Sequence, residues 1–184
     1  TADEDFTLLL NALLTIEAYL AEHQTEAKKW IFSRVLCIIT GKGEMKAAFE
    51  QQVARYEQEG KLGQFVIVRT KWLETEDYPK LMSCADLGIS LHTSTSGLDL
   101  PMKVLDMFGC GVPVCAVDFF TLSELLKHGV NGMVFGNQGE LASQLIQLLF
   151  NTENSLLLKL KENTSQIEHW DELWTSVVKP YLFA

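Results

Sequence analysis

The sequence predicts an α/β fold, in which a doubly wound parallel sheet is covered by helices on both faces. Short apolar runs alternate along the chain with segments of helical periodicity, and the strand runs are apolar at nearly every position. Strands of a parallel sheet that are buried on both faces have this unbroken apolar pattern. The 184 residues contain no repeat, low-complexity tract or Pro/Gly-rich linker, so we expect one domain.

The first half of the chain alternates helices with strands. A capping box at 1–4 indicates the start of a helix, in which apolar residues recur at helical spacing from Phe6 and which runs to about Ala21. Strands are predicted at 35–39, 65–68 and 87–91, with helices between them at 44–59 and 76–84. Because a helix precedes the first strand run, we expect the sheet to lack its first strand.

The second half continues the alternation. A polar loop at 93–97 leads to a helix at about 100–110, with Pro101 in its first turn and Gly111 ending it. A strand at 113–117, a helix at 122–127, a strand at 133–135 and further helices follow. The tryptophan-containing segment 170–174 is interpreted as a packing helix.

Composition excludes several classes of protein. The net charge of −9 is unsuited to nucleic acid, whose phosphates require clustered Lys and Arg. No apolar run approaches the roughly 20 residues that span a bilayer, and the acidic first residues do not resemble a signal peptide. No zinc or P-loop spacing is present, so we expect no metal cofactor. The four cysteines form no C-x-x-C pair and are predicted to be reduced core residues in a cytosolic environment.

Ligands of doubly wound sheets bind outside the carboxyl ends of the strands, which directs attention to the loops that begin at Thr40, Arg69, His92 and Asp118. Gly41 and Gly43 follow a strand and precede a helix, where backbone N–H groups can approach a phosphate. A tight turn explains these glycines equally well. The incomplete glycine pattern is unfavourable for a dinucleotide site.

The segment 92–106 is more informative. Four hydroxyl residues and Gly97 follow a strand directly, and Lys103 and Asp106 then lie three residues apart on one face of a helix. The lysine can neutralise a phosphate and the aspartate can accept hydrogen bonds from a ribose diol, although a solvated ion pair is an equal alternative. Glu124 can bind a sugar or simply favour the N-terminus of its helix.

The run 98–114 resembles the donor-binding signature of glycosyltransferases with two Rossmann-like domains (the GT-B fold), and 123–135 resembles their next motif, a Glu-hydrophobic pair followed by Asn-Gly. More narrowly, the runs 1–6, 72–79, 91–103 and 169–172 resemble the β-mannosyltransferases that act on dolichol-linked chitobiose. The likeness covers nearly the whole chain.

The resemblance implies that residues 1–184 are the C-terminal domain that binds GDP-mannose. It also implies an inverting β-1,4 transfer of mannose to GlcNAc₂-diphosphodolichol, on the cytosolic face of the endoplasmic reticulum. An N-terminal acceptor-binding domain with a membrane anchor would carry the general base, so this chain alone would be inactive. Other glycosyltransferases of the pathway are possible partners.

Position by position, the resemblance assigns the ribose to Asp106, phosphate contacts to the stretch containing Lys103, and the sugar or diphosphate to Glu124. Leu98 occupies the place where retaining relatives carry a glutamate, which agrees with inversion. The complete set of expected donor-binding residues is Gly41, Gly43, Trp72, Leu73, His92, Thr93, Ser94, Thr95, Ser96, Gly97, Asp99, Lys103, Asp106 and Glu124.

Three other functions remain open. The first is an interaction module that binds no ligand. The second is the donor half of a glycosyltransferase that uses another sugar nucleotide, and the third is a nucleotide-dependent oxidoreductase. The incomplete glycine pattern makes the last of these the least favoured.

Overall fold

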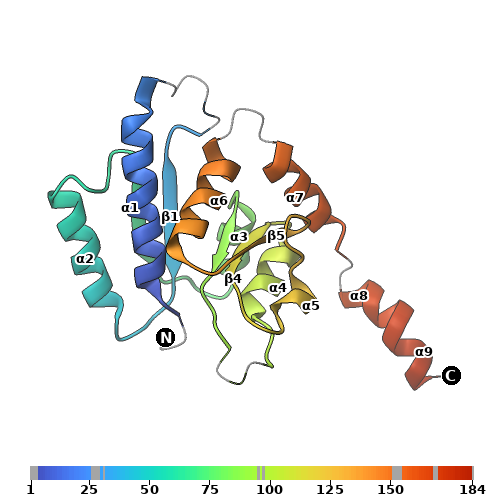
Figure 1. Ribbon diagram of the computed structural model, residues 1–184. Helices are drawn as coiled ribbons and strands as arrows, with labels where there is room; N and C mark the ends of the chain where they lie inside the picture. Colours follow the sequence, from blue (N-terminus) through green and yellow to red (C-terminus); the bar gives the residue numbers. More distant parts are fainter. Residues whose placement is uncertain are drawn as a thin grey trace.

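The computed structural model describes residues 4–25, 30, 32–94, 96, 98–150, 155–167 and 170–183. Its strands form two parallel sheets (Figure 1). In the first, β1 (Val35–Thr40) pairs with β2 (Val66–Lys71), so that Val35 is opposite Val66. In the second, β4 (Val114–Val117) lies between β3 (Gly88–Ser90) and β5 (Gly132–Phe135). The predicted parallel α/β fold is confirmed, with its sheet in two parts.

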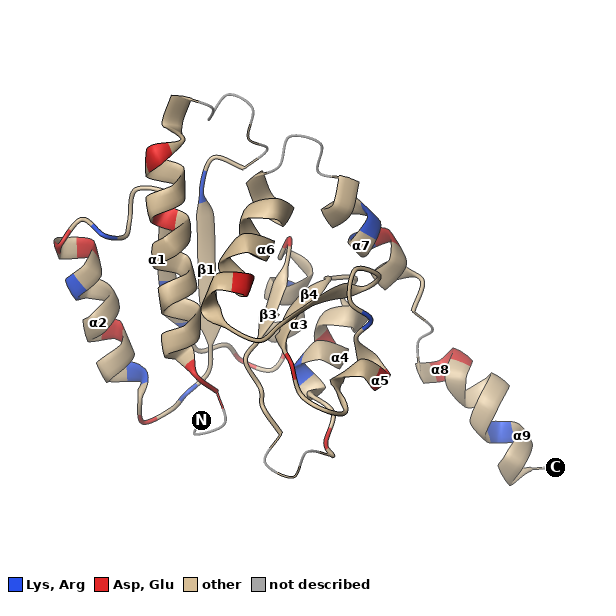
Figure 2. Cartoon of the chain, viewed as in Figure 1, with Lys and Arg blue, Asp and Glu red and all other residues tan. Residues whose placement is uncertain are grey.

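Helices connect the strands in the predicted alternation. Within the described residues they are α1 (Phe6–Glu22), α2 (Lys46–Gln58), α3 (Tyr78–Ser83), α4 (Met102–Gly109), α5 (Leu122–Leu125), α6 (Gln138–Phe150), α7 (Ser155–Ser165), α8 (Trp170–Leu173), the π-helical segment η2 (Trp174–Val178) and α9 (Lys179–Leu182). Acidic and basic residues are interspersed on the helices and loops, most clearly along α2 (Figure 2).

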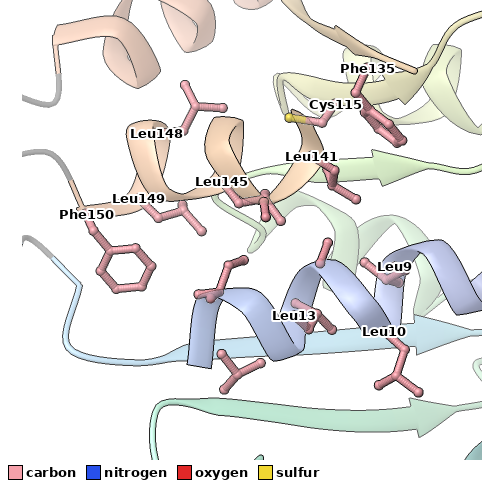
Figure 3. Packing of buried hydrophobic residues seen from close by; sticks show 14 of the residues in the cluster. Leu9, Leu10, Leu13, Cys115, Phe135, Leu141, Leu145, Leu148, Leu149 and Phe150 are labelled. Atoms are coloured by element: carbon pink, nitrogen blue, oxygen red, sulfur yellow. The ribbon is translucent and has the colours of Figure 1, made fainter. Parts of the chain in front are cut away.

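Strand β4 shows how the two faces of its sheet are covered. Cys115 belongs to the larger apolar cluster, which includes the buried sides of α1 and α6 (Figure 3). Val114 and Ala116 belong to a second cluster, with Val104 and Phe108 of α4. Successive side chains of a strand point to opposite faces, so helices cover both faces of this sheet, as predicted.

Helix α1 begins one turn later than the predicted capping box. Asp5 is the N-cap, and its carboxylate accepts hydrogen bonds from the amides of Thr7, at 2.9 Å, and Leu8, at 3.4 Å. Residues 1–3 of the capping box lie outside the described residues, and Glu4 instead bridges to His92. A short polar side chain one residue before the apolar pattern was therefore the better signal for the start of the helix.

Strand β1 departs from the prediction that its apolar run is buried on both faces. Val35, Cys37 and Ile39 pack against the larger cluster, but Leu36 on the opposite face is 59% exposed. The reason is topological: in the described structure β1 has a neighbouring strand only on the β2 side, and no helix covers Leu36.

Other local predictions also need correction. Pro101 is the extended N-cap of α4 rather than a residue of its first turn, whereas Gly111 follows the helix with a φ of 71°, as its predicted role requires.

Cys115 is buried in the core, and its pKa is raised to about 12 by that burial. Cys84 is exposed, so not all of the cysteines are core residues.

The segment α8–η2–α9 extends away from the sheets (Figure 1) and contains no buried residue. Trp170 is 67% exposed and lies beside Trp174, with ring centroids 6.0 Å apart. The prediction of a packing helix at 170–174 is therefore wrong, because its aromatic spacing is helical but no described part of the chain covers it. Within the described residues, no helix is long and apolar enough to cross a membrane.

Candidate functional site

The carboxyl ends of the strands carry the polar loops that the sequence singled out. Strands β1 to β4 end at Thr40, Lys71, Ser90 and Val117, respectively. The loops predicted to begin at Thr40, His92 and Asp118 therefore begin within two residues of the expected positions. Arg69 instead lies within β2, where its guanidinium bonds to Glu57 of α2 at 3.0 Å, so the loop after this strand begins at Trp72.

Asp99 is the centre of the loop that follows β3. Its carboxylate accepts a hydrogen bond from Ser96 Oγ at 3.2 Å and another from Ser94 Oγ. His92 Nε2 lies 2.8 Å from the other carboxylate oxygen of Asp99. Four predicted site residues are thus brought together by one carboxylate, which shapes the loop.

These hydrogen bonds change the acidity of Asp99. The bond from Ser94, followed by that from His92, lowers the pKa of Asp99 from 3.8 to about 2, because both donors favour the charged carboxylate. Asp99 is therefore a fixed negative charge near neutral pH. Since a carboxylate repels a diphosphate, this geometry supports a role for Asp99 in shaping the loop or binding sugar hydroxyls, and disfavours direct phosphate contact.

Phe119 and Thr121, which follow β4, also contact the loop that contains Asp99, and neither was predicted from the sequence. Thr121 is only 5% exposed, and its hydroxyl donates to the carbonyl oxygen of Asp99 at 3.1 Å. The ring of Phe119 packs edge-on against His92, with centroids 6.0 Å apart. A hydroxyl residue directly before a predicted helix was the available signal for Thr121. Its partner lies 22 residues away, which no local pattern reveals.

Lys103 lies in the first turn of α4, as predicted, but its ammonium is already paired. Its Nζ forms an ion pair with the carboxylate of Glu4. Glu4 also bridges His92 through the backbone, so Lys103 is held close to the loop after β3. Lys103 is 52% exposed at its side chain. A phosphate at this position would compete with Glu4 for the same ammonium.

Asp106 lies one turn further along α4 and is exposed. Tyr78, at the start of α3, is close enough to be affected by it: burial is the main cause that raises the pKa of Tyr78, and the charge of Asp106 adds to that effect. Asp106 is therefore an exposed carboxylate close to the start of α3. Glu124 is exposed in the first turn of α5, a position that fits both of its predicted roles.

The glycine turn after β1 forms a backbone hydrogen bond to the end of β2. Gly41 has a φ of 141°, a conformation that side chains disfavour, and its amide donates to the carbonyl oxygen of Lys71 at 3.1 Å. The Gly41 amide is therefore occupied, which favours the tight-turn interpretation for this residue. Gly43 is exposed, with open space where a Cβ would stand.

The loops after β1 and β2 meet through a cation–π contact. Lys42 Nζ lies 3.9 Å from the ring centroid of Trp72, which is 50% exposed, and Leu73 beside it is half-buried. This contact places an aromatic surface beside a positive charge at the sheet edge. Lys42 was not among the predicted site residues, although its place between two predicted glycines was the signal.

The remaining predicted residues complete the description. Thr93 is exposed at the start of the loop. Thr95 and Gly97 lie outside the described residues. Across the parts of the chain that the structure describes, no group of three or more His, Cys, Asp or Glu side chains is placed to hold a metal ion.

A parallel α/β domain with polar loops gathered at its carboxyl edge has the architecture of a glycosyltransferase domain of the GT-B type. The profile of the family described as glycosyl transferases group 1 matches residues 11–151. The chain belongs to this family.

Similar proteins extend the likeness over nearly the whole chain. The human chitobiosyldiphosphodolichol beta-mannosyltransferase is 45% identical over 98% of the chain, and that of Candida albicans is 42% identical over 95%. The Arabidopsis thaliana protein named UDP-glycosyltransferase TURAN is 40% identical over 99%. The chain spans only 37%, 36% and 41% of the lengths of these relatives, respectively.

Solved structures share the fold at lower identity. The C-terminal domain of a glycosyl transferase group 1 family protein from Francisella tularensis has a TM-score of 0.62 at 15% identity, covering 96% of this chain and 80% of that one. Anabaena HepE in complex with UDP-glucose has a TM-score of 0.56 at 22% identity, covering 83% and 47%.

Proposed function

We propose that this chain is the donor-binding part of an inverting β-1,4-mannosyltransferase, which moves mannose from GDP-mannose to dolichol-linked chitobiose. The observation that carries the proposal is the 42–45% identity, over 95–98% of the chain, to proteins named for that acceptor and that sugar. Similarity along the full length includes the loops at the carboxyl edge, where doubly wound sheets bind ligands.

The geometry of α4 supports the position of the nucleotide. Lys103 and Asp106 share one face of the helix. In the proposed complex Asp106 accepts hydrogen bonds from the ribose diol. The diphosphate displaces Glu4 and forms an ion pair with Lys103. The base stacks on the exposed ring of Trp72, beside Lys42.

The chemistry at this edge follows from where charge develops. As the bond between mannose and GDP breaks, negative charge grows on the diphosphate, and a preorganised lysine and backbone N–H groups stabilise it. At the start of α2 the amide of Lys46 already donates to the carbonyl oxygen of Gly43 at 3.1 Å, but the N-cap Met45 provides no side-chain hydrogen bond, so the next amides of this first turn are suited to the role. Inversion also requires a general base at the acceptor hydroxyl. We assign that base, the acceptor site and attachment to the cytosolic face of the endoplasmic reticulum to parts of the enzyme beyond these 184 residues.

Calorimetric titration with GDP tests the proposal. We expect saturable binding that is weaker for UDP, and a loss of roughly tenfold or more in affinity for Asp106→Ala, since a hydrogen bond to a charged group contributes about 1.5–3 kcal/mol. Glu162→Ala, an exposed acid on α7, is the matched control and should bind GDP like the parent chain. Equal binding of GDP by both variants would contradict the assignment of Asp106.

A second candidate is a donor half that uses a UDP-linked sugar. It is favoured by the name of the Arabidopsis thaliana relative and by the Anabaena complex with UDP-glucose. Tighter binding of UDP than of GDP in the same titration would support it. Absence of any nucleotide binding by the folded chain would instead favour an interaction domain.

A further inference from the structure

The ion pair of Glu4 with Lys103 lies at the edge where the donor is placed above. Glu4 comes directly before Asp5, the N-cap of α1, and Lys103 lies in the first turn of α4. Figure 1 shows the start of α1 and the loop that leads into α4 at the same edge of the sheets. A carboxylate and an ammonium that are 99 positions apart in the sequence are thus paired at the carboxyl edge.

The carboxylate of Glu4 is held in place from two directions. The backbone of Glu4 forms a bridge with His92, which fixes it to the loop after β3. Asp5, the next residue, is fixed because its carboxylate accepts the amide of Thr7 at 2.9 Å. The side chain of Glu4 is 10% exposed, whereas that of Lys103 is 52% exposed. A ligand that takes over the ammonium therefore leaves the carboxylate of Glu4 close by.

The order of residues along α4 and the loop before it decides which part of the donor meets this carboxylate. Asp106, which is assigned to the ribose, lies one turn beyond Lys103 in α4. Asp99, whose carboxylate suits sugar hydroxyls, lies before the helix, and its partner His92 carries the bridge to Glu4. Lys103 thus lies between the nucleoside side and the sugar side of the site. The phosphate nearest to Glu4 is therefore the one that bears the sugar.

Transfer of the sugar changes the charge of that phosphate. In the donor, this terminal phosphate is esterified to the sugar. In the transfer, the acceptor oxygen bonds to the sugar and the bond from the sugar to the phosphate oxygen breaks, so that its electron pair stays on the phosphate. The freed terminal phosphate loses its second proton near about pH 6, so the product nucleotide has about one more negative charge than the donor at neutral pH.

The neighbouring histidine does not offset the carboxylate of Glu4. The ring of His92 is engaged through Nε2 with Asp99, 2.8 Å away, and packs edge-on against Phe119. The ammonium of Lys103 therefore serves both Glu4 and the phosphate. Two anionic groups share one cation in the complex, an arrangement that becomes less favourable as the charge of the ligand grows.

We propose that Glu4 discriminates against the product: its carboxylate repels the nucleoside diphosphate left after transfer more strongly than the sugar nucleotide, and so promotes product release. The extra charge of the product lies on the phosphate next to Glu4, and repulsion grows with the product of the two charges. Glu4 returns to Lys103 as the diphosphate leaves, because its backbone stays anchored beside the ammonium. This inference rests on the position of the diphosphate proposed above.

The test compares the binding of GDP and GDP-mannose to Glu4→Gln and to the parent chain. Glutamine keeps the size of the side chain and removes its charge. We expect GDP to bind about tenfold more tightly to the variant and GDP-mannose only about threefold, because the carboxylate repels the extra charge of GDP. In stopped-flow measurements the gain should appear as slower release, since a buried charge beside a ligand acts mainly on the dissociation rate. Equal gains for the two ligands, no gain, or a gain confined to the association rate would overturn the proposal.

Glu22→Gln is the matched control, because it removes the same charge at the exposed far end of α1. Screening by salt should keep its effect on either ligand below about twofold. Glu4→Ala decides the matter if Glu4→Gln does not fold. It also removes the carboxylate, and it should favour GDP over GDP-mannose in the same order.

UDP and UDP-glucose separate the role of Glu4 from the choice of nucleotide. They differ by the same charge, so a chain that uses a UDP-linked sugar should show the larger gain for UDP; the GDP-mannose donor is then wrong and the role of Glu4 stands. If GDP binds and Asp106→Ala weakens it, but Glu4→Gln changes nothing, the donor assignment stands and the role of Glu4 is wrong. If the folded chain binds none of the four nucleotides, both are wrong.

Discussion

Glu17 offers the most direct test of how α1 holds the first sheet. Its carboxylate is 5% exposed and accepts the amide of Gln64 at 2.9 Å, that of Phe65 at 3.1 and 3.2 Å, and that of Val66 at 2.7 Å. One buried carboxylate thus accepts hydrogen bonds from three successive backbone amides at the start of β2. The substitution Glu17→Ala leaves these amides without an acceptor.

The expected cost follows from the exposure of the three donors. Val66 is fully buried and bears the whole penalty of a lost charged hydrogen bond, about 2–3 kcal/mol. Phe65 is half-buried and Gln64 exposed, so water replaces much of their loss and together they add about 1–2 kcal/mol. We therefore expect Glu17→Ala to lower the free energy of unfolding by about 4 kcal/mol. Glu17→Gln keeps one acceptor oxygen and should cost about half of that.

Urea unfolding measures the effect. With a slope of about 2 kcal/mol per molar urea, the midpoint of Glu17→Ala should fall by about 2 M. Glu22→Ala, on the exposed end of the same helix, is the matched control and should change stability by less than about 0.5 kcal/mol. A loss below 1 kcal/mol for Glu17→Ala, or equal losses for the alanine and glutamine variants, would refute the capping role.

Two further predictions concern the loop after β3 and the packing of the second sheet. Asp99 should titrate near pH 2 rather than 3.8 in a carbonyl NMR titration; because its pKa is lowered, the associated stabilisation is present above pH 3.8 and is lost as the pH falls toward 2. His92→Ala should raise that pKa, and an unchanged value would contradict the hydrogen bond. A Cβ at Gly132 would overlap the backbone carbonyl of β4, whereas one at Gly88 meets the flexible end of Met107. Gly132→Ala should therefore cost about 3 kcal/mol in urea unfolding and Gly88→Ala about 1 kcal/mol, and the reverse order would be evidence against this packing.

Local patterns in the sequence predicted the elements and the edge where the site lies. Apolar runs and helical periodicity identified β1, β2 and α1, because those patterns depend on residues that are close in sequence. Gly111 marked the end of α4, since its positive φ suits glycine best. The loop containing His92 and Asp99 followed from the rule that the carboxyl ends of parallel strands form one edge.

Contacts between distant segments were decided by the tertiary structure alone. Lys103 was predicted either to neutralise a phosphate or to form a solvated ion pair with Asp106, but folding brings Glu4 to it across 99 positions. Asp99 was expected to contact the donor, and it is also the acceptor that organises three neighbouring side chains. Neither pairing leaves a periodic signal in the sequence.

Burial likewise depends on what lies beside a segment. The apolar run of β1 predicted a strand, yet the exposure of Leu36 follows from the absence of a described neighbour on one side. Trp170 has the spacing of a helix face, but the direction of α8 leaves it exposed. The sequence by itself determined the order and type of the elements, because these are local properties of the chain. Only the tertiary structure decided which surfaces and charges meet, because those contacts join residues far apart in sequence.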